Sequence, residues 1–296
     1  MSGGQEFEAH RGYLFSIAYR LLGSAGDAED IVQDTYLRYV QAQPAHVENL
    51  RGYLATITVR LCMDQLRSAR ARREVYAGPW LPEPIATADR PDLTETLILR
   101  ESLSLAFLYM LEALAPLERV VFVLREVFDY DYADIAQVVE KSEANCRQVF
   151  HRARQRLAEH RARFEASSEQ QRRVTEAFLH AACSGDMDQL LQLLNTNLSE
   201  DAVFVGDGGG KVRGAGLKPV QGAANVSRGL VGNLLKFPPD SVSLEEINGQ
   251  PALVATKDGS LYAVLVLEVE DGRIRALLTV LNPDKLRPLG RQLGMG

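Results

Sequence analysis

The strongest constraint on the fold is a change in the spacing of apolar residues near residue 165. Before that point apolar residues recur with helical period, as in residues 14–22. After it come short β-type runs at 202–205, 242–247, 252–256, 261–269 and 274–281. Asn248-Gly249, Asp258-Gly259 and Asp271-Gly272 separate successive runs, and such pairs favour hairpin turns because they tolerate positive φ. The pattern predicts an all-helical front half and an α+β back half with an antiparallel sheet.

The spacing also divides the 296 residues into segments. Helices are expected over 6–22, 28–41, 51–73, 93–115, 117–127, 129–139, 143–164, 172–182, 187–194 and 223–235. Residues 77–92 hold four of the twelve prolines and show no helical period, which is typical of a linker. The expected organisation is a helical domain at 1–76, a linker at 77–92, a second helical domain at 93–165 and an α+β domain at 166–296.

Charge is unevenly distributed along the chain. The formal net charge of −6 argues against nucleic-acid binding, yet residues 51–73 carry 6 basic and 1 acidic side chains, and residues 141–163 carry 7 and 2. Residues 74–140 are acidic, with 13 acidic side chains against 4 basic ones. Basic clusters on helices are typical of contact with phosphates, although a solvated helix face is an equal alternative for either cluster alone.

The second basic cluster has the features of a helix-turn-helix. A short helix ends near Val139, and Ser142 can cap the next helix. That helix carries a buried stripe, and its other face is polar. The polar residues expected to contact DNA are Ser142, Glu143, Asn145, Arg147, Gln148, His151, Arg152 and Arg154. Glu140 occupies a turn position where glycine is common, which predicts a strained or a longer turn. An ordinary helical hairpin is the alternative.

Several other classes are disfavoured. No apolar run reaches the ~18 residues of a membrane span, and residues 1–12 lack the order of a signal peptide. Three scattered cysteines favour a reducing cytoplasm and predict neither a disulfide framework nor a metal site. The segment at 206–212 is not a phosphate-binding P-loop, because it is one residue too short before Lys211 and lacks the following Ser or Thr. We therefore expect no catalytic residue, no metal and no cofactor.

Residues 1–165 resemble a bacterial RNA polymerase sigma factor of the extracytoplasmic-function type. DAEDIVQDTYLRY at 27–39 looks like regions 2.1–2.2, which dock on the β′ clamp helices of the polymerase. GYLATITVRLCMDQLRSARARRE at 52–74 looks like regions 2.3–2.4, which melt and read the −10 element, and residues 114–157 look like region 4, which reads the −35 element. Two positions depart from the usual pattern: Arg60 replaces a common Asn, and Cys146 replaces a common Val.

The resemblance assigns roles to particular residues. It implies contact with the polymerase through Asp27, Glu29, Asp30, Gln33, Asp34 and Arg38. It implies contact with the −10 element through Tyr53, Arg60, Arg67, Arg70, Arg72 and Arg73. The implied partners are core RNA polymerase, at its β′ clamp helices and β flap, and promoter DNA.

Three further motifs resemble those of one subgroup, group 41 (sigma-J type), whose members carry a C-terminal SnoaL-like domain with the NTF2-type cone fold. The motifs are WLPEP (Trp80, Leu81, Pro82, Glu83, Pro84), DGGGK (Asp207, Gly208, Gly209, Gly210, Lys211) and NPDKL (Asn282, Pro283, Asp284, Lys285, Leu286). The resemblance implies regulation in cis by this domain, without a separate anti-sigma factor. We expect the DGGGK loop and the NPDKL segment to contact the linker; the alternative for DGGGK is a plain hairpin turn.

Two readings of the whole chain remain open. The resemblance favours an alternative sigma factor with a C-terminal regulatory domain. The alternative is a one-component transcriptional regulator that binds DNA by itself and senses a small molecule through its C-terminal domain. A small-molecule ligand in the cone fits either reading, because that fold is concave and apolar inside.

Overall fold

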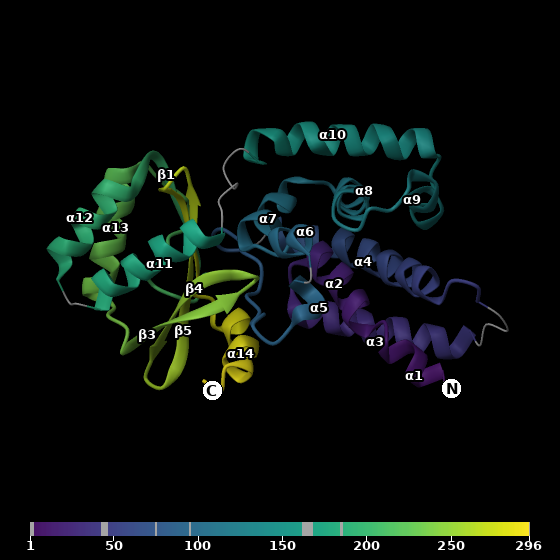
Figure 1. Cartoon of the computed structure of the whole chain (residues 1–296), viewed down its shortest axis with the longest axis horizontal. Helices are drawn as coiled ribbons and strands as arrows, with labels where there is room; N and C mark the ends of the chain where they lie inside the picture. Colours follow the sequence, from purple (N-terminus) through teal and green to yellow (C-terminus); the bar gives the residue numbers. More distant parts are fainter. Residues whose placement is uncertain are drawn as a thin grey trace. The chain divides into compact units, whose positions relative to one another are not determined.

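The computed structural model describes residues 3–42, 47–74, 76–94, 96–161, 168–183 and 186–295, without the side chains of 69–74, 159–161, 168 and 183. The chain forms two compact units (Figure 1). The first comprises residues 1–75, 90–103 and 107–160, and the second comprises 76–89, 104–106 and 161–296. Residues 77–89, most of the segment 77–92 expected to be a linker, are therefore part of the second unit, together with Tyr76; below, the linker is residues 76–89.

The first unit is all-helical. Its elements are α1 (Gly3–Glu8), α2 (Arg11–Leu22), α3 (Ala25–Ala42), α4 (Leu50–Glu74), α5 (Pro91–Thr94), α6 (Leu97–Glu101), α7 (Leu105–Met110), η1 (Leu111–Ala113), α8 (Pro116–Glu126), α9 (Tyr132–Val139) and α10 (Glu143–Arg161), although residues 105–106 of α7 and 161 of α10 fall in the second unit. Helices α2, α3 and α4 pack against one another. Gly23 ends α2 with φ of 67°, a left-handed conformation that glycine adopts without steric cost.

A buried arginine joins α2 to the segment that follows the linker. Arg20 is 1% exposed, and its Nε donates to Ser102 Oγ over 2.9 Å. Its Nη2 donates to the carbonyl oxygens of Leu93 at 3.1 Å and Leu99 at 2.6 Å. These bonds tie residues 93–102 to the first helical bundle, and nothing in the apolar spacing predicts them.

Helices α8, α9 and α10 form the predicted helix-turn-helix. Cys146, Ala153 and Leu157 are buried on α10, in agreement with the predicted stripe. The turn residue Glu140 has φ of 55° and ψ of 50°. A left-handed conformation costs a non-glycine residue roughly 1–2 kcal/mol, so the turn is short and strained, the first of the two outcomes predicted.

The second unit contains a six-stranded sheet in the order β2-β1-β6-β5-β4-β3. The strands are β1 (Leu198–Asp207), β2 (Val220–Gln221), β3 (Ser241–Ile247), β4 (Gln250–Lys257), β5 (Ser260–Glu270) and β6 (Arg273–Val280). The predicted hairpin turns between β3, β4, β5 and β6 are confirmed. Their first residues, Asn248, Asp258 and Asp271, have φ of 55°, 50° and 49°.

One pairing differs from the antiparallel sheet expected from the sequence. Strand β1 pairs with β6 in parallel, whereas the other four pairings among the described strands are antiparallel. Strand β1 reaches the sheet through the connection that contains β2 and α13, so the hairpin signals could not place it. A parallel neighbour needs such a long crossover.

Helices α11 (Ser168–Cys183), α12 (Met187–Asn197) and α13 (Ala223–Lys236) cover one face of the curved sheet (Figure 1). Their apolar residues share one core with Leu253, Leu267 and Leu277 of the sheet. Helix α14 (Pro283–Gln292) packs against β5 at the end of the chain. The second unit is thus an α+β domain whose helices cover one face of a curved sheet, as expected, and we call it the cone.

Candidate functional site

The three short motifs meet around one buried carboxylate in the second unit. Asp207, the last residue of β1, is 0% exposed. Its Oδ2 accepts a hydrogen bond from the Leu81 N–H at 2.8 Å and lies 2.7 Å from Lys285 Nζ. Its Oδ1 accepts from the Tyr76 hydroxyl at 2.6 Å and from the Gly209 N–H at 3.1 Å. A buried carboxylate requires such partners, and here they come from all three motifs and from Tyr76.

Lys285 joins this carboxylate to the linker. Its ammonium group also donates to the Leu81 carbonyl oxygen, so Leu81 is held through both of its backbone polar groups. The Nζ lies 4.0 Å from the centroid of the Trp80 ring and 5.1 Å from that of Tyr76. Cation–π contacts of this kind are worth more when the cation is desolvated, as Lys285 is. We name Tyr76, Trp80, Leu81, Asp207 and Lys285 the linker dock.

The surrounding backbone is shaped to fit the dock. Asn282 caps α14 through its side chain, which accepts from the Asp284 N–H at 3.1 Å, and its Nδ2 donates to the Tyr76 hydroxyl at 2.8 Å. A Cβ placed on Gly209 would lie 2.4 Å from Asn282 Nδ2. Burial and the hydrogen bond to Asp207 raise the pKa of Tyr76, so its hydroxyl remains a donor at neutral pH.

The linker is held at a second place, on the edge strand β3. Ala86 forms an antiparallel bridge with Ile247, and the Thr87 N–H donates to the Glu246 carbonyl over 3.1 Å. Asn248 joins Ile85 through two bonds, one from its own N–H at 2.9 Å and one to its Oδ1 at 3.0 Å. An edge strand has unpaired backbone groups, and the linker covers some of those of β3. Tyr76, the contact of Asn248 with the linker and this strand-like pairing were not predicted from the sequence.

The other motif residues lie at the margin of the dock. Pro82, Pro84, Gly208 and Leu286 are buried, Glu83 is half-buried, and Gly210, Pro283 and Asp284 are exposed. Lys211 pairs with Asp284 at the surface, with side chains 53% and 52% exposed. DGGGK and NPDKL are therefore joined by an ion pair in the interior, by an ion pair at the surface and by a backbone hydrogen bond from the Asn282 N–H to the Asp207 carbonyl at 2.8 Å.

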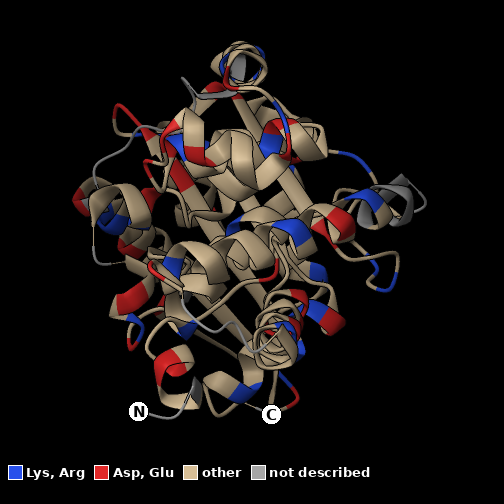
Figure 2. Ribbon diagram, turned by 90° about the vertical axis from the view of Figure 1, so that its right-hand side faces the viewer, with Lys and Arg blue, Asp and Glu red and all other residues tan. Residues whose placement is uncertain are grey.

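The second basic cluster lies on α10 and is exposed. All eight residues expected to contact the −35 element are exposed: Ser142, Glu143, Asn145, Arg147, Gln148, His151, Arg152 and Arg154. The Ser142 hydroxyl accepts from the Asn145 N–H at 3.2 Å, as expected of a cap. In Figure 2, α10 is seen nearly end-on at the top, with blue positions on its ribbon. The helix thus presents basic and polar side chains to solvent.

Residues expected to contact the −10 element lie on α4, and one of them is engaged elsewhere. Arg60 donates from Nε to the Val138 carbonyl at 3.2 Å and from Nη2 to the Gln137 carbonyl at 3.1 Å. The same Nη2 lies 3.1 Å from Glu140 Oε1. A cation at the last carbonyl groups of a helix is favourable, so Arg60 caps α9. Tyr53 is half-buried and Arg67 exposed, while the side chains of Arg70, Arg72 and Arg73 are outside the described residues.

The acidic cluster lies along α3. Glu29, Asp30, Gln33, Asp34 and Arg38 are exposed, and Asp27 is half-buried. Next to them the apolar side chains of Tyr36, Leu37 and Val40 are 37%, 49% and 46% exposed. An exposed apolar patch rimmed by charge is typical of a protein-binding surface.

Within the described residues, no group of three His, Cys, Asp or Glu side chains could hold a metal ion. No helix of the described part of the chain is both long and apolar enough to cross a membrane.

Comparison with known proteins identifies the family. Sigma-70 region 2 matches residues 7–72, and Sigma-70, region 4 matches residues 104–157. The chain is 34% identical to the probable ECF RNA polymerase sigma factor SigI of Mycobacterium tuberculosis, over 98% of this chain and 97% of that protein. It is also 34% identical to the ECF RNA polymerase sigma factor SigJ of that species, over 95% and 92%.

A solved structure extends the likeness to the whole fold. The crystal structure of Mycobacterium tuberculosis SigJ superposes with a TM-score of 0.77 at 32% identity, covering 96% of this chain and 98% of that one. The likeness therefore includes the C-terminal cone as well as both helical regions. The chain belongs to the extracytoplasmic-function sigma factors of RNA polymerase, the alternative sigma factors that direct transcription initiation.

Proposed function

We propose that this sigma factor binds core RNA polymerase through α3 and promoter DNA through α4 and α10, under control of its own C-terminal cone. The α3 surface with its exposed apolar and acidic side chains is the proposed contact with the β′ clamp helices. The second proposed polymerase contact, with the β flap, belongs to region 4. On α10, Arg147, Gln148 and Arg152 are exposed and can reach base edges or phosphates in a major groove.

The observation that supports control by the protein's own C-terminal cone is the linker dock. Residues 76–89 connect region 2 to region 4 along the chain, and they are fastened to the cone at the dock and at β3. Fourteen free residues could span up to about 50 Å when extended. Docking removes most of that freedom, so the cone limits which separations of regions 2 and 4 the protein can sample. We propose that initiation requires release of the linker.

The contact made by Arg60 also supports inhibition of initiation in the arrangement described. Arg60 is a proposed contact for the −10 element, and here its guanidinium group binds α9 of region 4. Reading both promoter elements requires this contact to break. The docked linker and the Arg60 cap therefore both favour an arrangement that does not initiate.

We propose that the protein acts without enzymatic activity and without a separate anti-sigma factor. We also propose that a small molecule binds in the cone. A sigma factor differs from a one-component regulator because it requires core polymerase to bind and read a promoter. The test is transcription from a duplex library with randomised −35 and −10 elements, with and without core enzyme. Transcripts should depend on both proteins and share a sequence preference. Gln148→Ala should alter the selected −35 bases, whereas Arg154→Ala should weaken initiation equally across sequences. Tight, selective DNA binding without core enzyme would contradict the proposal.

A further inference from the structure

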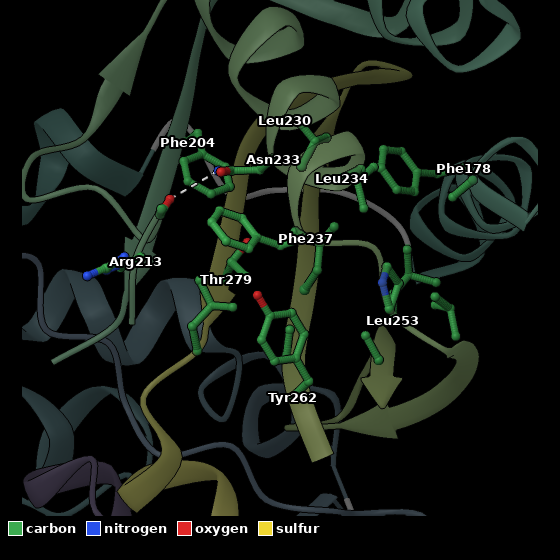
Figure 3. A pocket seen from close by; sticks show the side chains of 18 residues that line it. Phe178, Phe204, Arg213, Leu230, Asn233, Leu234, Phe237, Leu253, Tyr262 and Thr279 are labelled. Atoms are coloured by element: carbon green, nitrogen blue, oxygen red, sulfur yellow. Dashed lines mark hydrogen bonds between the residues drawn. The ribbon is translucent and has the colours of Figure 1, made fainter. Parts of the chain in front are cut away.

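The cone contains a cavity that neither promoter recognition nor the linker dock uses. It has a volume of about 110 Å³ and lies between the concave face of the sheet and helices α11 and α13 (Figure 3). Its wall is largely apolar, with Phe178, Phe204, Phe237, Leu253 and Leu265 among the lining residues. An apolar cavity of roughly 150 Å³ holds one benzene molecule, so this smaller cavity admits a molecule of at most about one ring.

Two hydroxyl groups interrupt this apolar wall. Thr279 of β6 is 8% exposed, and its Oγ1 has no hydrogen-bond partner within the described residues. A buried hydroxyl without a partner is costly, which makes its position in the cavity wall informative. Thr279 pairs across the sheet with Leu265, which also lines the cavity.

The second hydroxyl belongs to Tyr262, and an irregularity of the sheet places it there. Ala255 pairs with Ala263 and Thr256 pairs with Leu261, so Tyr262 is an extra residue in β5. Such a bulge can redirect a side chain toward a site. Figure 3 shows the Tyr262 ring inside the cavity, with its hydroxyl directed toward the side of Thr279 and Phe237.

The remaining polar side chains of the wall indicate a neutral ligand. Asn233 is occupied, because its Nδ2 donates to the Gly214 carbonyl at 3.0 Å. Among the described residues that line the cavity, Arg213 is the one charged side chain; it is exposed and extends away from the centre of the cavity (Figure 3). A carboxylate or ammonium group in the cavity would therefore lose its hydration without a buried partner of opposite charge.

We propose that this cavity binds a neutral molecule of about one ring, whose oxygen accepts hydrogen bonds from the hydroxyl groups of Tyr262 and Thr279. The inference rests on the proposed function only in placing a ligand in the cone. Apolar burial supplies most of the affinity, and the two hydroxyl groups select a carbonyl or hydroxyl oxygen. The cone should therefore bind weakly polar ring compounds in preference to charged metabolites.

The test is a ligand-detected NMR titration of the full chain with three matched probes, acetophenone, ethylbenzene and benzoate. Acetophenone should bind with a dissociation constant about three- to tenfold below that of ethylbenzene, as expected of one or two net hydrogen bonds. Benzoate should bind more than tenfold more weakly than acetophenone. Absence of saturable acetophenone binding, or equal affinity for benzoate, would overturn the proposal.

Variants of the cavity wall distinguish hydrogen bonding to the ligand oxygen from binding by apolar burial alone. Tyr262→Phe and Thr279→Val should each weaken acetophenone binding about three- to tenfold and leave ethylbenzene unchanged. Thr256→Val is the matched control, because the Thr256 hydroxyl bonds to Ser241 over 2.6 Å and is not part of the cavity wall. Unchanged acetophenone affinity in both cavity variants, or equal weakening by Thr256→Val, would contradict the assignment. The experiment contains no polymerase, so its failure is distinct from failure of the initiation test.

Discussion

Lys285 and Asp207 form an ion pair in the interior of the second unit, with 2.7 Å between Nζ and Oδ2 and side chains 7% and 0% exposed. A pair buried to this degree is strongly stabilised only if every remaining donor and acceptor is satisfied. Here the linker satisfies them, through Tyr76 and both backbone polar groups of Leu81. Docking of the linker and integrity of the ion pair are therefore coupled.

Removing the carboxylate charge should destabilise the protein strongly. Asp207→Asn leaves the Lys285 ammonium buried without a counter-charge, and breaking a buried pair from one side costs about 3–5 kcal/mol. Urea denaturation of the full chain measures the change in the free energy of unfolding. Lys211→Met is the control, since its exposed pair with Asp284 should be worth at most about 1 kcal/mol. Equal losses for the two variants would refute the role of the interior pair.

The DGGGK loop should not tolerate a side chain at its second glycine. Gly209 has φ of 57°, and a Cβ there would lie 2.4 Å from Asn282 Nδ2 and 3.0 Å from Tyr76 Oη. Gly209→Ala should therefore lower stability by about 1–3 kcal/mol through backbone strain and displacement of the dock. Gly229→Ala, in α13 with no atom within 4 Å of the added Cβ, should raise stability by about 0.5–1 kcal/mol. Thermal unfolding of both variants measures the two changes in stability, which should have opposite signs.

The turn of the helix-turn-helix should be relieved by glycine. Glu140→Gly and Glu140→Ala both remove the carboxylate that pairs with Arg60, but only glycine accepts φ of 55° without strain. The glycine variant should be more stable than the alanine variant by about 1 kcal/mol. Urea denaturation of the two variants provides the comparison, and a more stable alanine variant would show that the left-handed turn is not strained.

A buried acid should make stability depend on pH. Burial raises the pKa of Glu268 to about 7, against the ordinary 4.5, while the hydrogen bond from Gln250 Nε2 at 3.2 Å opposes the rise. Between these values the folded protein binds more protons than the unfolded chain, so this contribution is full below pH 4.5 and declines up to pH 7.

Glu268→Gln removes that dependence while keeping an acceptor oxygen for Gln250. Relative to the unsubstituted protein, the variant should gain stability as pH rises from 5 to 8, by at most about 3 kcal/mol. Urea denaturation at four pH values in this range measures the difference. A difference that stays constant with pH would contradict the raised pKa.

The sequence predicted the elements that local patterns define. The Asx-Gly pairs placed three turns, and the apolar stripe of α10 identified the buried side of the second basic cluster. The single helix expected over 93–115 was wrong. Thr96 caps a new helix by accepting from the Leu99 N–H at 3.2 Å, and Ser102 ends it, so the segment is divided into short helices. Local hydrogen bonding by Ser and Thr outweighed the apolar spacing.

The linker dock depended on contacts that spacing does not encode. Motif resemblance brought Asp207, Lys285 and Trp80 into one hypothesis, and the structure places them in contact. Tyr76 lay outside every motif, although it donates to Asp207 and accepts from Asn282. The helix begun by Asn282 was also missed, despite an Asn-Pro pair that suits its first turn. Tyr76 is 131 positions from Asp207 and 206 positions from Asn282 along the chain, and contacts over such separations form only in the folded protein.

The most direct test of linker-controlled initiation uses Trp80, the single tryptophan of the chain. Trp80→Ala removes the ring that covers the Lys285 ammonium at 4.0 Å and leaves Asp207 in place. Leu235→Ala is the control, because it removes an apolar side chain of the same unit that is 64% exposed and lies on α13, away from the linker dock. The measurement is run-off transcription at limiting core polymerase, on a promoter selected from the randomised library. We predict a several-fold higher yield for Trp80→Ala than for the control, and an equal or lower yield would contradict release of the linker as the step that permits initiation.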